Sequence, residues 1–345
     1  MNHEFYMQRC LELAQLGAGN VAPNPMVGCV IVFENKIIGE GYHREFGETH
    51  AEVNAIADVD NKKVLEKSTL YVNLEPCVHF GKTPPCSDLI IKHKIPNVVI
   101  GSIDNNKLVS GKGVDHLKSH GVKVEINILE QSCKSLNKRF YTSHTKKRPY
   151  IILKWAETQD GFISRLKNKG QLLKDNWITS ENSKVLSHQI RANEQAILIG
   201  KNTALNDNPS LTTRLVEGKY PIRILLCNNP SGLEDLKILN DPYPTIIFNS
   251  KIEKKIKNKE WIKFDGSIKH LLDKLSEKNI QSIIIEGGSN VLNQFITNNI
   301  WDEAIQFIGN KNFEKGIVAP ALLKYNSKHT LKSGEDTVNH FYRCT

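Results

Sequence analysis

The segment from His50 to Cys86 decides how the first half of this chain is interpreted. It reads His-Ala-Glu at positions 50–52 and, further on, Glu-Pro-Cys-Val-His-Phe-Gly-Lys-Thr-Pro-Pro-Cys at 75–86. The imidazole of His50 and the thiolates of Cys77 and Cys86 make a three-ligand set, which leaves the fourth tetrahedral position on zinc open for water. A structural site would normally supply a fourth cysteine or histidine. The segment therefore predicts a zinc site of the catalytic type.

The carboxylate of Glu52 gives this predicted site a proton carrier. Glu52 lies two residues after His50, close enough to reach a water on the metal without being a ligand. His-x-Glu followed by Pro-Cys and a further Cys is typical of zinc-dependent base deaminases, in which the glutamate moves protons. The alternative is an unrelated triplet beside two buried thiols, because eight residues separate Cys77 from Cys86 instead of the usual two. The strand-like segment Thr69–Leu74 directly before Glu-Pro-Cys favours the metal site.

Length and composition are those of an ordinary globular protein. A chain of 345 residues predicts two domains, and a hydrophobic content of 39% is enough for each to build a core. No apolar run reaches the length of a membrane span, and the first seven residues carry an acid where a signal peptide would be basic. With seven cysteines, mostly read as reduced and buried thiols, we expect a cytoplasmic protein. The net charge of +9 suits a phosphorylated metabolite, a dinucleotide or a nucleic acid, without choosing among them.

Strands and helices alternate through the first half of the sequence. Apolar periodicity and turn residues predict helices at 4–17, 51–59, 87–93 and 130–141, and strands at 26–33, 37–40, 70–74, 97–102 and 120–124. This alternation favours an α/β sandwich around a mostly parallel sheet. The metal ligands then lie at a helix start and in the loop after the 70–74 strand. The polar, basic segment Thr142–Pro149 is expected to hold the domain boundary.

The second half of the sequence begins with a predicted buried strand and contains a glycine-rich turn near residue 287. Apolar runs predict strands at 150–156, 196–200, 222–227, 245–248 and 282–285, and the composition of 180–193 predicts a helix. Glu-Gly-Gly-Ser-Asn at 286–290 joins a strand to a helix, where free backbone N–H groups suit a phosphate, although many such turns bind nothing. The lysine-rich segment 251–263 is interpreted as solvated surface, because no nucleic-acid module accompanies it.

Further motifs surround the metal ligands and continue in order through the second half. The first half contains Ala-Pro-Asn-Pro-Met-Val-Gly at 22–28, Gly-Tyr-His at 41–43 and Thr-His-Ala-Glu at 49–52. The second half contains Lys-Trp-Ala-Glu-Thr-Gln-Asp-Gly at 154–161, Trp-Ile-Thr-Ser at 177–180, Asn-Asp-Asn-Pro-Ser-Leu-Thr-Thr-Arg at 206–214 and Ile-Glu-Gly-Gly-Ser at 285–289. Over nearly its whole length the chain resembles the bifunctional deaminase–reductase family of riboflavin biosynthesis, in which the long cysteine spacing is normal.

The resemblance implies an N-terminal cytidine-deaminase-like α/β/α sandwich over residues 1–145 and a C-terminal dihydrofolate-reductase-like α/β domain over 146–345. The first domain would hydrolyse the 2-amino group of 2,5-diamino-6-ribosylamino-4(3H)-pyrimidinone 5′-phosphate. The second would use NADPH to reduce the ribosyl group of the resulting aminouracil to ribityl. One Zn²⁺ per deaminase domain, NADPH and a small phosphorylated pyrimidine are therefore expected to bind, as is a homo-oligomer formed through the reductase domain. Neither a nucleic acid nor a membrane is an expected partner.

Motif matching also implies which residues form the two sites. The zinc ligands are His50, Cys77 and Cys86, and Glu52 is the catalytic residue. The expected substrate-binding residues of the deaminase are Asn24, His43, His79, Lys82, Thr83, Asp104 and Asn106. The expected NADPH-binding residues are Glu157, Trp177, Thr203, Asp207, Asn228, Gly288, Ser289, Asn290, Val291, Leu292, Asn293 and Gln294. The expected substrate-binding residues of the reductase are Arg191, Leu211, Arg214 and Glu286, with Lys154 and Asp160 as further pocket candidates.

The sequence departs from the family pattern at a few places. Asp175 stands where the family often has a small hydroxyl residue beside the substrate, and it is left out because an acid would repel a phosphate. Cys227-Asn228 replaces the usual Asp-Ser, and Asp104–Lys107 lacks the rigid prolines of the family segment. The segment 307–317 lacks the common Pro-Lys-Leu-Leu-Gly. These differences bear mainly on the reductase half.

Two other functions use part of the same sequence. A zinc deaminase of free or RNA-borne nucleosides with an accessory binding domain would leave the 206–214 and 285–289 motifs unexplained, and it would not bind NADPH. A non-catalytic, zinc-stabilised protein that binds nucleic acid requires a fourth protein ligand and gives Glu52 no task. Salt-sensitive RNA binding without turnover would favour this second alternative.

Overall fold

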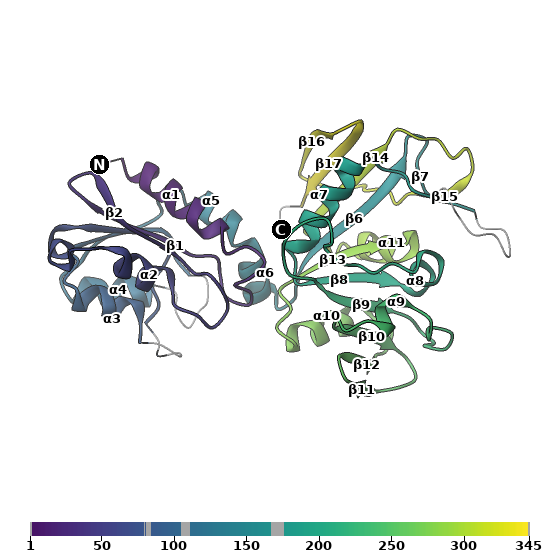
Figure 1. Cartoon of the computed structure of the whole chain (residues 1–345), viewed down its shortest axis with the longest axis horizontal. Coiled ribbons are helices and arrows are strands. Elements are labelled where there is room, and N and C mark those ends of the chain that lie inside the picture. Colours follow the sequence, from purple (N-terminus) through teal and green to yellow (C-terminus); the bar gives the residue numbers. More distant parts are fainter. Residues whose placement is uncertain (1, 79, 81–83, 105–110, 167–175, 344–345) are drawn as a thin grey trace. The chain divides into compact units, whose positions relative to one another are not determined.

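The computed structural model describes the chain except for residues 1, 79, 81–83, 105–110, 167–175 and 344–345. It divides into two compact units, Met1–Lys147 and Arg148–Thr345 (Figure 1). Each unit has a sheet of its own and a hydrophobic core of its own.

The N-terminal unit is built on a mixed five-stranded sheet, counted over the described residues. Its strands lie in the order β2 (Lys36–Tyr42), β1 (Gly28–Phe33), β3 (Thr69–Leu74), β4 (Asn97–Ser102) and β5 (Lys123–Glu125). β3, β4 and β5 are parallel, whereas β1 is antiparallel to both of its neighbours. The expectation of a mostly parallel sheet is therefore wrong for half of these pairs. The two-residue turn at Glu34 and Asn35, both with positive φ, folds β1 and β2 into a hairpin. β3 then pairs with the other side of β1 and is also antiparallel to it.

Helices cover both faces of this sheet because its central strands bury both sides. Ile31 and Val72 belong to the core under α2 (Ala51–Asp58), α3 (Cys86–Lys92) and α4 (Lys112–Ser119), together with the short 3₁₀ helix Lys62–Lys67. Val30 and Tyr71 pack on the opposite face against α1 (His3–Gln15) and α5 (Glu130–Leu136). Figure 1 shows these two helix layers above and below the sheet. The predicted α/β/α sandwich is confirmed.

In place of the single helix expected over 130–141, the structure has two helices, α5 and α6 (Lys138–Lys146). α6 covers much of the polar segment Thr142–Pro149, which was expected to hold the domain boundary. The break falls at Asn137, whose side chain is used elsewhere. Its Oδ1 accepts from the backbone N–H of Met26 at 2.8 Å, and its Nδ2 donates to the Met26 carbonyl at 2.9 Å. Asn137 thereby fixes the segment that leads into β1.

The C-terminal unit contains a ten-stranded sheet among the described residues, parallel at its centre and antiparallel at its edges. The strands lie in the order β11 (Lys254–Ile256), β12 (Lys259–Lys263), β10 (Thr245–Asn249), β9 (Ile222–Leu226), β8 (Ala196–Gly200), β13 (Ser282–Gly287), β6 (Tyr150–Thr158), β14 (Glu303–Gly309), β17 (Asp336–Tyr342) and β16 (Ser327–Ser333). A separate ribbon pairs β7 (Phe162–Arg165) with β15 (Gly316–Val318).

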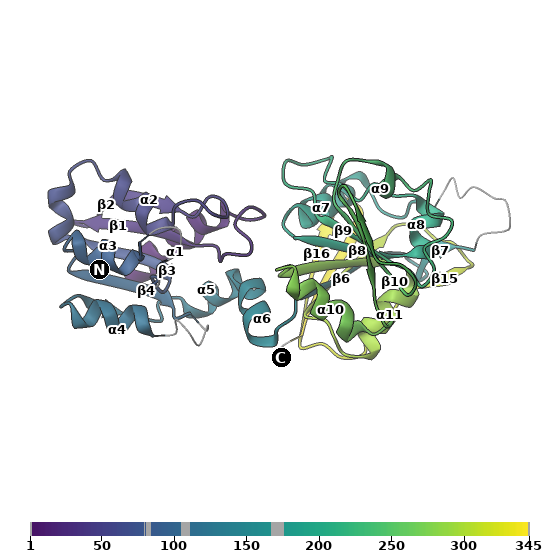
Figure 2. The ribbon, with the colours of Figure 1, turned by 90° about the horizontal axis from the view of Figure 1, so that it is seen from below.

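Two helix layers also enclose this sheet. α10 (Ile268–Glu277) and α11 (Ser289–Thr297) pack on the face that carries Ile151 and Leu153. The opposite face, with Ile152 and Ile284, is covered by α7 (Glu181–Ala192), α8 (Lys201–Asp207) and α9 (Lys237–Asn240). Figure 2 shows α7 and α9 on one side of the sheet and α10 and α11 on the other. Because Lys154 and Glu286 share the face of Ile152 and Ile284, their side chains meet α7.

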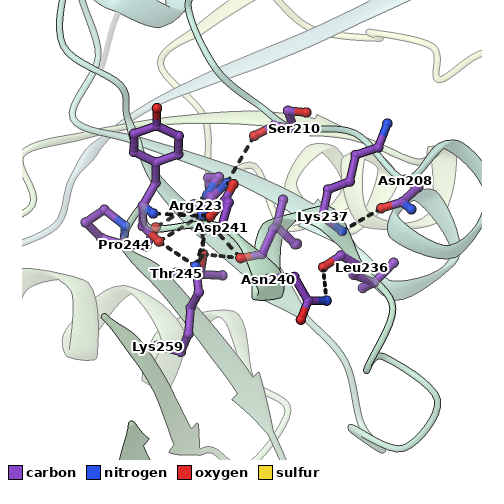
Figure 3. Close-up of polar contacts among 12 residues, drawn as sticks. Asn208, Ser210, Arg223, Leu236, Lys237, Asn240, Asp241, Pro244, Thr245 and Lys259 are labelled. Atoms are coloured by element: carbon purple, nitrogen blue, oxygen red, sulfur yellow. Dashed lines mark hydrogen bonds and ion pairs between the residues drawn. The ribbon is translucent and has the colours of Figure 1, made fainter. Parts of the chain in front are cut away.

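The lysine-rich segment 251–263 is not a uniformly solvated surface, because it contains β11 and β12 and buries Lys259. Lys259 donates to the carboxylate of Asp241 at 3.1 Å, and Arg223 of β9, 1% exposed, binds the same carboxylate (Figure 3). Burial opposes ionisation of Asp241, but hydrogen bonds from Arg223 and Lys259 lower its pKa to about 2. The two cations and one anion tie β9, β12 and the chain before β10 together at the amino ends of these strands.

Candidate active sites

The three predicted zinc ligands meet at the carboxyl end of β3. His50 is the N-cap residue of α2, Cys77 lies in the loop after β3, and Cys86 is the first residue of α3. Nδ1 of His50 lies 3.2 Å from Sγ of Cys86 and 3.6 Å from Sγ of Cys77. One ligand atom from each residue lies within 4.8 Å of the other two. One nitrogen and two sulfurs at this spacing fit Zn²⁺ with one coordination position left open.

The two thiols differ strongly in acidity. The pKa of Cys77 is lowered to about 4, mainly by a hydrogen bond from Cys86 and then by one from His50. The same interaction, with burial, raises the pKa of Cys86 well above its ordinary range. The hydrogen bond between the two sulfurs thus favours loss of the first of the two thiol protons. This behaviour fits a metal-binding pair rather than two inert core cysteines.

Glu52 lies in the first turn of α2, directly beside the ligand cluster, and is 3% exposed. The pKa of this carboxyl is raised to about 7, mainly by burial and then by the nearby Cys77. A carboxyl group with a pKa near neutrality both accepts and returns a proton readily. The first turn of α2 thus holds a carboxyl group suited to proton transfer two residues after His50.

Asn24 and His43, both expected at the deaminase substrate, lie together beside the zinc ligands. Nδ2 of Asn24 lies 3.1 Å from Nε2 of His43, and Nδ1 of His43 lies 3.1 Å from the Thr49 carbonyl. The carbonyl can only accept, so Nδ1 carries the proton and Nε2 accepts from Asn24. The His43 ring meets the His50 ring edge to face at 5.7 Å. Burial lowers the pKa of His43, which keeps its imidazole neutral.

Glu75 is a residue of this site whose role the sequence did not suggest. Its carboxylate, 5% exposed, accepts hydrogen bonds from four backbone N–H groups. The donors are Asp104 at 3.2 Å, Gly111 at 3.0 Å, Gly113 at 2.7 Å and Val114 at 3.2 Å. Glu75 therefore joins the zinc loop to the segment that carries Asp104 and to the start of α4. An acid at the end of a fully buried strand was the available signal, because a buried carboxylate requires donors.

Some residues expected at the sites lie outside the described part of the chain. They are His79, Lys82, Thr83 and Asn106 of the deaminase, together with Asp175, which was left out of the reductase site. Asp104 is described and is buried.

In the C-terminal unit, an ion-pair cluster gathers three expected residues. Glu286, near the carboxyl end of β13, accepts two hydrogen bonds from Arg191 of α7, at 2.8 and 2.6 Å. Nζ of Lys154, from β6, lies 3.3 Å from the same carboxylate and over the ring of Phe307. Burial opposes its ionisation, but Arg191 and then Lys154 lower the pKa of Glu286 to about 2. A buried cluster with more positive than negative groups suits an anionic ligand.

A narrow glycine-lined cradle lies at the carboxyl ends of β8 and β13. β8 runs through Gly200 into α8, and β13 runs through Gly287 and Gly288 into α11. A Cβ on Gly200 would come within 2.9 Å of the Val291 side chain, and one on Gly288 within 3.2 Å of the Thr203 hydroxyl oxygen. No side chain of the described residues caps the start of α11. The first backbone N–H groups of this helix are thus open to a phosphate, which fits the expected binding of NADPH at Thr203 and at 288–294.

The other expected residues are distributed around these two features. Leu211 is buried with a positive φ, whereas Arg214 is exposed. Asn228 follows β9, next to β8, and Asp207 is the last residue of α8. Glu157 accepts from the Trp155 indole at 2.7 Å, and Trp177 is 51% exposed. Asp160 accepts from the backbone N–H groups of Phe313 and Glu314, so its carboxylate holds these two parts of the chain together.

Two family models match this chain, one within each unit. Residues 1–102 match the cytidine and deoxycytidylate deaminase zinc-binding region, and residues 149–313 match the RibD C-terminal domain. The riboflavin biosynthesis protein RibD of Aquifex aeolicus is 39% identical over 98% of both chains. The chain belongs to the RibD family. The RibD proteins of Bacillus amyloliquefaciens and Escherichia coli are 36% and 32% identical, over 95% and 90% of this chain and 90% and 88% of their own.

Solved structures of the family share the whole fold. A deaminase/reductase from Thermotoga maritima, described as acting on diaminohydroxyphosphoribosylaminopyrimidine and 5-amino-6-(5-phosphoribosylamino)uracil, superposes with a TM-score of 0.88 at 37% identity over 99% of both chains. Acinetobacter baumannii RibD superposes with a TM-score of 0.87 at 28% identity over 99% of both chains.

The expected family and fold class are therefore confirmed, including the dihydrofolate-reductase-like α/β fold of the reductase. As a RibD family member, the chain is a bifunctional enzyme of riboflavin biosynthesis, with a zinc-dependent deaminase and an NADPH-dependent reductase. In the described residues, every helix is too short or too polar to cross a membrane.

Proposed function

We propose that the unit formed by residues 1–147 deaminates 2,5-diamino-6-ribosylamino-4(3H)-pyrimidinone 5′-phosphate and that the unit formed by residues 148–345 reduces the product. The division of the chain between Lys147 and Arg148 supports the assignment of the two reactions to two separate units. The observation that carries the proposal is the cluster of His50, Cys77 and Cys86 with the buried Glu52 beside it. It is supported by the function printed for the Thermotoga maritima relative.

In the deaminase, Glu52 carries the protons and the neighbouring side chains hold the base. Zinc, held by His50, Cys77 and Cys86, supplies a Lewis acid that makes water nucleophilic near neutral pH. Glu52 would pass one proton of the water to the ring nitrogen as the oxygen adds to the carbon, and would then pass the proton of the new hydroxyl group to the amino group, which leaves as ammonia. Asn24, already bonded to His43, keeps its carbonyl oxygen available for the substrate. His79, Lys82, Thr83, Asp104 and Asn106 complete the proposed substrate site, with Lys82 suited to the phosphate.

In the reductase, the chain's task is to hold the sugar against the nicotinamide, because NADPH supplies the hydride. Lys154, Arg191 and Glu286 form the charged floor of the substrate site, and Arg214 provides a second guanidinium for the phosphate. Leu211 supplies an apolar wall. The proposed cofactor contacts lie at the adjacent strand ends and helix starts: Glu157, Trp177, Thr203, Asp207, Asn228 and residues 288–294.

The proposal is tested by following ammonia release and NADPH absorbance together on the purified chain with the diaminopyrimidinone ribotide. Ammonia release followed by NADPH consumption is expected, and both should stop after zinc chelation, because the second step needs the product of the first. NADPH consumption should return when the chelated protein receives the deaminated intermediate. Ammonia release without NADPH consumption would contradict the reductase assignment. Absence of both signals in protein that contains zinc would contradict the substrate assignment.

We further infer a cytoplasmic homo-oligomer that associates through the reductase unit. The six cysteines in the described part of the chain are all free thiols, which fits a reducing compartment. β16 is an exposed edge strand, and Leu323 and Val318 expose 87% and 66% of their surface nearby in sequence. Light scattering of the chain should give a multiple of 39.0 kDa, and Leu323→Glu should lower this mass. A monomer at micromolar concentration would contradict the assembly, and exclusion from the cytoplasm in cell fractionation would contradict the location.

A further inference from the structure

One buried polar atom in the reductase unit has no partner. In the part of the chain that the structure describes, Nδ1 of His188 is the buried side-chain atom that lacks a hydrogen bond. His188 is 2% exposed and lies on α7, one turn before Arg191. A buried polar atom without a partner costs free energy, so this nitrogen contributes nothing to the stability of the fold. Such an atom requires another explanation, and a ligand that supplies the missing hydrogen bond is one.

The surroundings of His188 are the charged groups of the reductase site. Lys154, Arg191, Arg214 and Glu286 all act electrostatically on its ring. Lys154 comes from β6, Glu286 from β13, and Arg214 follows the loop after α8, so three separate parts of the chain converge on this face of α7. Arg191 and Lys154 are already bound to Glu286. His188 lies one turn before Arg191 on α7 and therefore beside the Arg191–Glu286 ion pair, although motif matching did not include it.

Among these groups, His188 differs in its charge. The pKa of His188 is lowered to about 4, mainly by burial and then by the nearby Arg191 and Arg214. The imidazole is thus neutral at physiological pH and offers one N–H donor and one lone pair. Lysine and arginine side chains are donors only, and both oxygens of Glu286 are used by Arg191. His188 consequently gives the pocket an uncharged hydrogen-bonding group that its charged neighbours cannot replace.

We propose that His188 is a positioning residue of the reductase and that its Nδ1 hydrogen-bonds a hydroxyl group of the substrate's phosphorylated sugar chain. This inference rests on the proposed reductase function. A hydroxyl group both donates and accepts, so it satisfies Nδ1 in either tautomer. The phosphate is better matched to Arg191 and Arg214, because guanidinium groups pair with its oxygens in a bidentate manner. His188 orients the sugar through this hydrogen bond.

The test compares His188→Leu with His188→Asn in the full chain. The two substituents have nearly the same shape, but only asparagine keeps a polar atom near the position of Nδ1. Gln189→Ala, at the exposed neighbouring position, is the control. We measure the KM and kcat of the reductase, the affinity for the ribityl product by calorimetry and the affinity for NADPH. We also measure ammonia release and the melting temperature. All four tryptophans, at 155, 177, 261 and 301, lie in the C-terminal unit, so their fluorescence follows the melting of this unit alone.

We expect His188→Leu to raise the reductase KM and weaken product binding about tenfold, with an unchanged or higher melting temperature. His188→Asn should stay within about threefold of the unsubstituted chain. NADPH affinity and ammonia release should be unchanged in both variants. Unchanged KM and product affinity in His188→Leu would overturn the proposal, as would a lower melting temperature with product binding retained.

A direct measurement covers the case in which His188→Leu does not fold. Addition of the product to histidine-labelled enzyme should shift the Nδ1 resonance of His188 in a nitrogen NMR spectrum, and an unmoved resonance at saturating product would overturn the proposal. The unsubstituted chain is assayed first. Failure of the proposed reductase function would appear there as a lack of NADPH consumption, whereas failure of the His188 assignment appears only in the comparison of variants.

Discussion

The carboxylate of Glu75 lies 2.7 Å from the backbone nitrogen of Gly113, where a side chain would not fit. A Cβ on Gly113 would come within 3.0 Å of Oε1 of Glu75 and 2.3 Å of the Pro76 carbonyl oxygen. Glycine at this position therefore allows α4 to begin directly against the zinc loop. The contact makes the position of Cys77 depend on a segment more than 25 residues further along the chain.

Glu75→Gln should weaken the deaminase while leaving zinc bound. The amide keeps one oxygen acceptor but turns an NH₂ group toward backbone N–H donors, so part of the network is lost at a cost of about 2 kcal/mol in unfolding free energy. We expect a higher KM for ammonia release, because Asp104 loses its anchor, with unchanged zinc content and unchanged reduction of added intermediate. Glu66→Gln, an exposed acid, is the control. A wild-type KM would show that Glu75 serves the fold only.

Glu52→Gln should retain zinc but release ammonia at least about 10²-fold more slowly, because an amide cannot carry the proton between water and the leaving group. Zinc content by atomic absorption and ammonia release by a coupled assay measure the two effects separately. Glu48→Gln, at an exposed position before the ligand, should behave as the unsubstituted enzyme does. Rapid ammonia release by Glu52→Gln would exclude Glu52 as the proton carrier.

Glu286→Gln should reduce the stability of the C-terminal unit in a pH-dependent way. The pKa of Glu286 is lowered from 4.5 to about 2, so its ionised form stabilises the fold above pH 4.5 and this contribution disappears as the pH falls toward 2. A shift of this size corresponds to about 3 kcal/mol at neutral pH. Urea unfolding followed by tryptophan fluorescence should show the difference between the two proteins shrinking from pH 7 to pH 3. A constant difference would contradict the pKa shift.

Asp207→Ala should impair the reductase alone. Asp207 ends α8, where a negative charge is unfavourable to the helix dipole, so its removal should not weaken that helix electrostatically. We expect about a tenfold loss in kcat/KM for NADPH, which corresponds to one lost hydrogen bond to the cofactor. Ammonia release should be unchanged, and Asp235→Ala, an exposed acid, serves as the control. Unchanged NADPH consumption would remove Asp207 from the cofactor site.

The zinc cluster could be predicted from the sequence because its chemistry depends on a few residue types in a fixed order. His50, Cys77 and Cys86 lie at element ends that short apolar runs and turn residues also mark. The glycine turn at 286–290 was similarly visible. Glu75 and His188 were not, because their roles depend on which backbone N–H groups or side chains lie next to them, and these neighbours come from distant parts of the sequence.

The strands at one side of the large sheet were likewise difficult to predict from the sequence. β14, β16 and β17 lack long apolar runs, and β16 is exposed along most of its length, so the periodicity of single strands carries little signal. Lys259 appears in a lysine-rich segment, yet it is buried because Asp241 neutralises it from another loop. Charge pairing of this kind overrides composition, and only the folded arrangement reveals it.

The Arg223, Asp241 and Lys259 cluster has a consequence for how the reductase unit tolerates change. It fastens β9 and β12 at their amino ends, whereas Gly200, Gly287 and Gly288 lie at the opposite, carboxyl ends of neighbouring strands. The ion-pair cluster and the glycines of the proposed cofactor site therefore lie at opposite ends of the strands of one sheet. Substitutions in the loops at the carboxyl ends should therefore alter ligand binding more than they alter the packing of β9 and β12, which the cluster holds together at the other end.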